Sequence, residues 1–415
     1  MSQTSTLNNK VPIAKINFLL ISLLPVTLVS GTLVSNITIV LIGILFLCEI
    51  INEKKWNYLD DVNFYFLIII NIYLIFNSYF FSENEQSIIK SIGFIRFIIM
   101  AYAISYYFEK FKIKILRNWF LFFLLVTIDL AIEFIFGKNI LGFESSYPAR
   151  LASFTGDELK IGGYYFGFIF LALSIFFEKK KNLFWFFFIA FFIIALLIGE
   201  RSNFIKIFFM YSVFFLFIFR STIIKKILFI ISIIIFSTII ISQIHSLKSK
   251  FVNQIFNKNL ISFLKLDKDT SINDVISTNR HFQHYNLALN IFNKNKLFGS
   301  GFKSFRIEGE KEEYRNSKLY TSSTHPHQSH FEILSELGIV GYILIMGNII
   351  ILATNYLRSK NKNFLKNSAL IFIIASMIPI LPSGSFFTSY VATIFFINYS
   401  FLIRPGISNE ILNKK

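Results

Sequence analysis

The sequence is poor in the residues and motifs behind several common kinds of chemistry. Its single cysteine, Cys48, lies inside an apolar run, so the chain alone can form neither a disulfide nor a site of several thiolates. It has no phosphate-binding P-loop, no dinucleotide-binding fingerprint and no Ser-His-Asp order of known spacing. No polar stretch reads as a soluble domain that could bind a nucleotide sugar. If the protein transfers a group, we expect the donor to lie in the membrane already.

Apolar side chains are what the sequence has in excess. Of 415 residues, 54% are hydrophobic and 54 are Phe, and the mean hydropathy is +0.60. The apolar residues form uninterrupted runs, and a run of about 18 or more can cross a bilayer as a helix. The sequence therefore predicts an all-α polytopic membrane protein. The first run follows Lys15 without a small-residue cleavage site, so we expect it to be a retained helix.

The apolar runs predict about twelve membrane spans at roughly 20 residues each. They lie at 14–30, 33–51, 62–81, 88–107, 115–136, 161–177, 183–199, 203–220, 222–242, 331–355, 365–384 and 387–403.

The net charge is +17, but the basic residues stand between hydrophobic runs, not along a nucleic-acid groove. Basic clusters follow every second predicted span, and the positive-inside rule places such loops and both termini in the cytoplasm. The opposite connections then face outward, and two of them are long: 137–160 and 243–330. We accordingly divide the chain into N-terminal spans at 1–136, a core at 137–345 and C-terminal spans at 346–415.

Three of the six histidines, His325, His327 and His330, fall within six residues where the large polar segment meets a hydrophobic helix. Histidine changes charge near neutral pH, so His327 is a candidate general base that could accept a proton from a sugar hydroxyl. The alternative is a solvated loop histidine. A metal site is a third possibility, but no acidic partner stands at a familiar spacing, and we predict no metal.

Arg201 stands between two predicted spans, in Gly199-Glu200-Arg201-Ser202. A guanidinium there could bind a phosphate or pyrophosphate through two parallel hydrogen bonds. It could equally extend toward lipid headgroups or pair with Glu200.

Two further arginines lie in the long outward connections. Arg280 falls on a predicted amphipathic helix, 279–292, capped by Ser277 or Thr278, where it would share a face with His284 and Leu287. The alternative for Arg280 is a solvated helix face. A turn at 299–302 would end that element. Arg150 lies in the shorter connection, where Asp157 and Glu158 are possible acidic partners.

The segment from His327 to Gly341, His-Gln-Ser-His-Phe-Glu-Ile-Leu-Ser-Glu-Leu-Gly-Ile-Val-Gly, resembles the signature of the O-antigen ligase and O-antigen polymerase superfamily. Arg280 with the Gly-x-Gly turn at 299–301, the Glu-Arg turn at 199–202 and the loop at 150–163 are similar to other parts of that family. The resemblance covers roughly 150–345. The chain departs from the family at Gln328, where Asn is usual, and at His330, where Tyr is usual.

The resemblance implies a metal-independent glycosyltransferase without a cofactor, in the bacterial inner membrane, with its active site facing the periplasm. The donor would be a glycan on undecaprenyl pyrophosphate and the acceptor a hydroxyl of lipid A–core. It implies that His327 activates the acceptor and that Arg201 and Arg280 neutralise the pyrophosphate. We add Arg150, His325, His330 and Glu336 as possible substrate-binding residues.

Two other functions stay open. An O-antigen polymerase uses the same donor but a lipid-linked repeat unit as acceptor, and the signature does not separate it from a ligase. A transporter or flippase of lipid-linked sugars belongs to another class. It would place functional polar residues at mid-membrane depth in pseudo-repeated halves, and the sequence shows neither.

Overall fold

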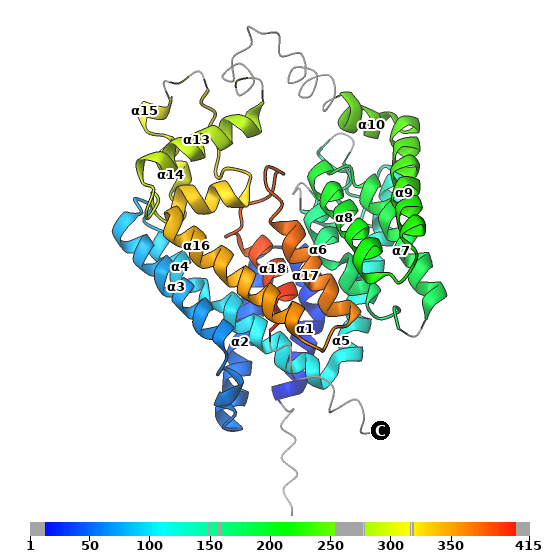
Figure 1. Cartoon of the computed structure of the whole chain (residues 1–415), viewed down its shortest axis with the longest axis horizontal. Helices are drawn as coiled ribbons and strands as arrows, with labels where there is room; N and C mark the ends of the chain where they lie inside the picture. Colours follow the sequence, from blue (N-terminus) through cyan, green and yellow to red (C-terminus); the bar gives the residue numbers. More distant parts are fainter. Residues whose placement is uncertain are drawn as a thin grey trace, which may run out of the picture.

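The computed structural model describes residues 13–147, 150–156, 160–178, 180–253, 277, 279–315, 317 and 319–403. Over these ranges the chain is helical and contains no strand. Seven helices are long and apolar enough to cross a membrane. The predicted all-α membrane architecture is therefore confirmed (Figure 1).

The N-terminal third forms five helices: α1 (Ile13–Ser30), α2 (Thr32–Asn52), α3 (Val62–Phe81), α4 (Ser87–Gly93) and α5 (Ile95–Phe136). The basic loop predicted between spans 88–107 and 115–136 is not a loop. Two helical segments of α5 meet there at a kink, at Phe111, whose backbone is not helical (φ −127°, ψ 18°). The intervening Lys residues form helices readily, which explains why a polar stretch does not end this one.

The middle third contains α6 (Ile161–Leu173), α7 (Lys181–Leu197), α8 (Arg201–Val213) and α9 (Ile223–Gln243), and a π-helical turn, Phe214–Ile218, extends α8. Short elements follow: α10 (His245–Lys248), a turn at Ser249–Asn253, α13 (Arg280–Lys294), α14 (Phe305–Gly309) and α15 (Glu312–Arg315). The last third is formed by α16 (Ser329–Arg358), α17 (Phe364–Ser376) and α18 (Ser389–Ser400).

Twelve spans are not confirmed. Beside the seven long helices, α6, α7 and α17 are apolar but shorter than 18 residues. The span predicted at 365–384 is too long, because α17 ends at Ser376. Pro379 and Pro382 follow, and the residue before a proline disfavours a helical backbone. The chain therefore runs from 377 to 388 without regular helix before α18 begins.

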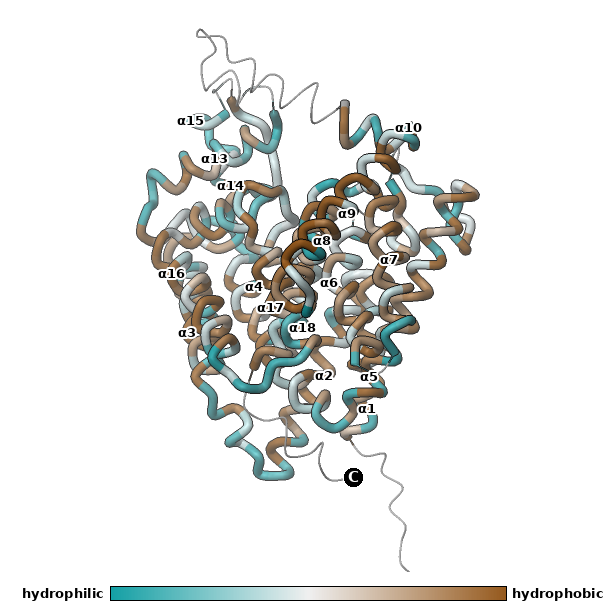
Figure 2. Tube along the Cα trace, turned by 45° about the vertical axis from the view of Figure 1, so that its right-hand side comes forward, coloured by the Kyte–Doolittle hydropathy of each residue, from teal (hydrophilic) through white to brown (hydrophobic). Residues whose placement is uncertain are grey.

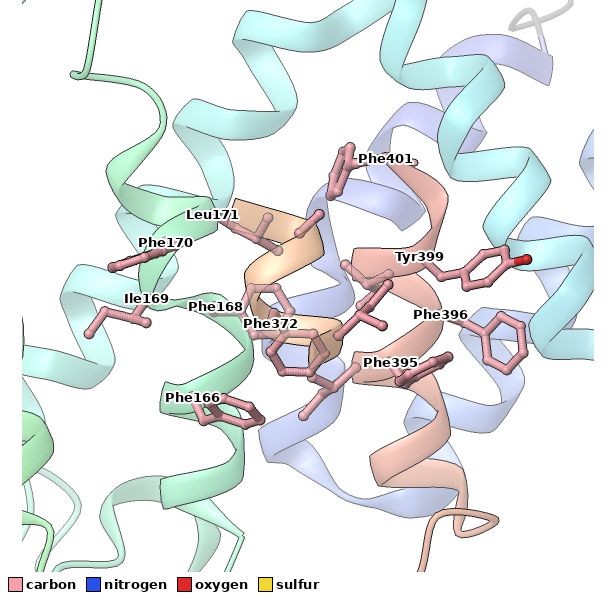
Figure 3. Packing of buried hydrophobic residues seen from close by; sticks show 14 of the residues in the cluster. Phe166, Phe168, Ile169, Phe170, Leu171, Phe372, Phe395, Phe396, Tyr399 and Phe401 are labelled. Atoms are coloured by element: carbon pink, nitrogen blue, oxygen red, sulfur yellow. The ribbon is translucent and has the colours of Figure 1, made fainter. Parts of the chain in front are cut away.

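The interior is built largely from aromatic rings. Phe166 of α6 packs on Phe372 of α17 with ring centroids 4.6 Å apart, and Phe395 and Phe396 of α18 lie beside them (Figure 3). Trp119 of α5 is fully buried and lies edge-on to Phe168. These contacts pack α5, α6, α17 and α18 together at the centre of the molecule.

The basic connections gather at one end of the bundle. Lys110 beside the α5 kink pairs with Glu49 of α2 at 2.7 Å, and the rings of Phe18 and Phe111 lie 5.0 Å apart. Phe177, after α6, stacks on Phe364 at the start of α17. Polar residues concentrate at both ends of the molecule and apolar residues between them (Figure 2). Which end faces the cytoplasm stays a prediction, and the termini at 1–12 and 404–415 lie outside the described residues.

Candidate functional site

At the end of the bundle opposite the basic connections, a loop carries His325 and His327 into the start of α16. Gln328 caps that helix, since its side-chain oxygen accepts the backbone N–H of Phe331 at 3.0 Å. Gln328 thus acts as an N-cap even though it is not among the usual capping residues. His327 adopts a left-handed backbone (φ 58°), and its carbonyl accepts the N–H of Ser383 at 2.7 Å.

α16 is broken where it enters the bundle. Gly338 has φ 65° and ψ −169°, far from helical values. The turn predicted at 299–302 pairs with this break: the N–H groups of Ser300 and Gly301 donate to the carbonyls of Ser335 and Glu336, both at 2.9 Å. In return the N–H of Ile339 donates to the carbonyl of Lys296 at 2.8 Å. Backbone groups freed by the break are therefore satisfied by this turn.

Glu336 holds this turn in place. Its side chain is buried and accepts the backbone N–H groups of Lys303 at 2.9 Å and Phe305 at 3.4 Å. Glu332, one turn earlier, accepts the N–H of Phe386 at 2.7 Å. The side chains of Glu332 and Glu336 thus fasten neighbouring segments to α16, and a substrate contact of Glu336 stays a prediction.

Four histidine rings meet beside the loop. His281 and His284 of α13 face His327 at centroid distances of 5.6 and 5.2 Å, and His325 lies 4.1 Å from His327. His281 is not among the candidate residues predicted from the sequence. Its spacing from His284, three residues along an amphipathic helix, was the available signal, because such residues share one face.

α13 begins where it was expected, but its cap is Asn279, whose side chain accepts the N–H of His281 at 2.9 Å. Ser277 or Thr278 was predicted instead. Asn is as good an N-cap as Ser, and this capping bond fixes the helix turn that carries His281.

Burial lowers the pKa of all four clustered histidines. For His284 it falls to about 4, chiefly through burial and then through the charges of His327 and His281. For His325 it falls to about 3 for the same leading reason, and burial alone lowers the pKa of His327. His327 is therefore held in the neutral form that can accept a proton.

Three nitrogens of these rings are buried and have no hydrogen-bond partner among the described residues: Nδ1 of His281, Nδ1 of His284 and Nε2 of His325. Within the described ranges, no group of three or more His, Cys, Asp or Glu side chains is arranged to hold a metal ion. The lowered pKa values of these rings favour their neutral forms.

His330 points away from this cluster. Its Nδ1 lies 3.0 Å from the Tyr342 hydroxyl, and its Nε2 lies 2.8 Å from the carbonyl oxygen of Met377. The side chain therefore ties α16 to the end of α17. These two contacts connect His330 to the bundle, and its predicted role as a possible substrate contact stays a prediction.

Arg201 is the first residue of α8, at the same end of the bundle. Its charge acts on His281, whose pKa is lowered by burial first, then by His327 and by Arg201. The possible pairing with Glu200 is not found: Glu200 accepts from the Gly162 N–H at 3.2 Å and the Asn203 amide at 2.7 Å. In the described part of the chain, no carboxylate pairs with Arg201.

Arg280 is the first residue of α13 and is exposed. It lies next to His281, and its charge acts on His284. Arg280, His284 and Leu287 were predicted to share one helix face, and of these three residues His284 and Leu287 are buried. The guanidinium is therefore at the rim of the histidine cluster, where it is free to reach a ligand.

Arg150 is held near Arg201 by a loop fastened to α5. Glu133 accepts the N–H groups of Ala152 at 3.0 Å and Ser153 at 2.7 Å, and the N–H of Leu151 donates to the Ile198 carbonyl at 3.2 Å. The suggested partners of Arg150, at 157 and 158, lie outside the described residues. An open cavity of about 310 Å³ lies beside Arg150.

Residues 185–346 match a protein family described as O-antigen ligase. This stretch contains Arg201, Arg280 and His327, and the match confirms the resemblance drawn from the sequence. Over this stretch, the match supports a similarity to O-antigen ligase-like membrane enzymes. No curated protein matches the chain.

Proposed function

We propose that this O-antigen ligase-like enzyme is a glycosyltransferase of the bacterial inner membrane. Its donor is a glycan on undecaprenyl pyrophosphate, and its acceptor is a hydroxyl of lipid A–core at the periplasmic face. The proposal assigns His327 as general base and Arg201 and Arg280 as ligands of the pyrophosphate.

The transfer is a substitution at the anomeric carbon of the glycan. His327 takes the proton of the acceptor hydroxyl as its oxygen bonds to that carbon. The bond from the anomeric carbon to the phosphate oxygen breaks, and its electron pair leaves with the lipid pyrophosphate. The guanidinium groups of Arg201 and Arg280 then balance the charge that develops on that oxygen.

The observation that carries the proposal is the position of His281. This ring faces His327 at 5.6 Å and also responds to the charge of Arg201. His281 therefore lies between His327 and Arg201, two residues that are far apart in the chain. Residues far apart in the chain are gathered at one end of the bundle, as a single site requires.

The same placement argues against transport. A carrier of lipid-linked sugars needs its polar site near mid-membrane, commonly at broken helices. Here the break in α16 is filled by the turn at 299–301, and the candidate residues stand at the end of the helices. These features support an enzyme over a flippase.

A strain lacking the gene tests the assignment through its surface polysaccharide. A ligase predicts loss of all glycan-capped core together with accumulation of lipid-linked polymer. Core that carries a single repeat unit would show a polymerase instead. Unchanged polysaccharide in the deletion strain, with the lipid-linked donor still present, would contradict both.

A further inference from the structure

A lysine outside the predicted site is held against the start of α8. Lys250 lies in the turn Ser249–Asn253 that follows α10. The next residue, Phe251, is buried and places its ring 5.8 Å from that of Phe204, one turn beyond Arg201. Leu247 is also buried. The segment is therefore anchored by apolar contacts on both sides of Lys250.

The same place receives Arg150. The hydrogen bond from Leu151 to the carbonyl of Ile198 brings that loop to the end of α7, three residues before Arg201. The charges of Arg150 and Arg201 both act on Lys250. Three cations thus converge from three separate segments of the chain.

Within the described ranges, little negative charge balances these three cations. Glu200 is the acidic group whose charge acts on Lys250, but its oxygens already accept from Gly162 and Asn203. Across the described ranges, no ion pair involves Arg150, Arg201 or Lys250. Like charges held together are unfavourable unless an anion joins them, so the cluster is suited to a ligand of more than one negative charge.

We propose that Lys250, together with Arg150 and Arg201, binds the diphosphate of the lipid-linked donor. This inference rests on the proposed function and adds a ligand that the sequence did not suggest. The diphosphate gains a negative charge when the glycan leaves. An additional cation therefore stabilises the departing group more than the intact donor, which is the differential binding that catalysis requires.

Diphosphate binding should change the protonation state of Lys250. Burial first, and then the charges of Arg150 and Arg201, lower the pKa of Lys250 to about 8, against the opposing effect of Glu200. Near pH 8 the free protein therefore holds this lysine partly neutral. A bound diphosphate favours the charged ammonium, so binding takes up protons from the buffer.

Calorimetry on the full-length protein in nanodiscs of zwitterionic lipid tests this. Farnesyl diphosphate and farnesyl monophosphate serve as probes at pH 8, in two buffers of different ionisation enthalpy. The variants are Lys250→Ala and Lys250→Arg. Lys248→Ala is the matched control, because Lys248 is exposed on the same segment.

We expect Lys250→Ala to weaken diphosphate binding by about tenfold or more, as truncating one member of a charged pair does, and Lys248→Ala to leave it unchanged. Lys250→Arg should keep most of the affinity but reduce proton uptake, because arginine stays protonated.

If Lys250→Ala binds the diphosphate as well as Lys248→Ala does, this inference is overturned while the proposed function stays intact. Equal Lys250-dependent binding of the monophosphate would also overturn it, as expected of a site for phospholipid headgroups. A wild-type protein that binds neither probe and transfers no glycan would overturn both proposals.

Discussion

Gly299 and Gly338 approach each other so closely that a Cβ atom on either would lie 2.6 Å from the backbone nitrogen of the other. Both have positive φ, 71° and 65°. Their contact joins the turn after α13 to the break in α16. It therefore sets where the histidines of α13 stand relative to His327.

Gly338→Ala should destabilise the protein, because it adds a Cβ to a left-handed position with no room for it. The strained backbone alone costs about 1–3 kcal/mol. The apparent melting temperature of the detergent-purified protein measures the effect. Gly347→Ala is the control, since a Cβ there would meet only Phe66, at 3.9 Å. Equal melting temperatures for the two variants would show that the contact does not hold α16.

Acid should loosen the packing of α13 against the His325–His327 loop. The pKa of His284 is about 4 in the folded protein, below the roughly 6.5 of a free imidazole. Between these values the unfolded chain binds more protons, so stability falls as pH drops through that window.

We expect the melting temperature to fall between pH 7.5 and pH 5, and His284→Asn to reduce that fall by roughly 2–4 °C. His245→Asn serves as control, because His245 is exposed on α10. A fall as large in His284→Asn as in the wild type would contradict the assignment of His284 as a neutral, packed imidazole.

Arg201→Lys should impair transfer although it preserves the charge. A lysine cannot reproduce the two parallel hydrogen bonds of a guanidinium on phosphate oxygens, and we expect a loss of roughly tenfold to a hundredfold in kcat/KM. Arg220→Lys, which changes an exposed residue between α8 and α9, is the matched control. Wild-type kinetics with purified lipid-linked donor would remove Arg201 from the mechanism.

Much of the fold was predictable from local pattern. The helical spacing of α13 and the turn at 299–302 were found, because capping residues and glycines act over a few neighbours. The break predicted between 107 and 115 is found as a kink at Phe111 and not as a loop, since the charged residues around it are also good helix formers. The end of α17 was missed because apolar composition outweighed Pro379 and Pro382 in a count based on hydrophobicity.

The site was only partly predictable for a different reason. His327 and Arg201 stand at recognisable boundaries between polar and apolar sequence. The partners of these residues, His281 and Lys250, are identified only by contacts between distant segments, such as the packing of Phe251 on Phe204. His330 was predicted as a possible substrate contact beside the candidate base His327, and nothing in the sequence indicated its bonds to Tyr342 and Met377.

The rate of glycan transfer by His327→Ala, measured with purified lipid-linked donor and acceptor, tests the central claim most directly. The pKa of His327 is lowered by burial, so wild-type activity should persist to a lower pH than an ordinary imidazole would allow, and should decline as the base becomes protonated. We predict that His327→Ala loses roughly 10²–10⁴-fold in rate, with wild-type abundance and melting temperature, while His245→Ala stays active. Full activity in a folded His327→Ala protein would contradict the account.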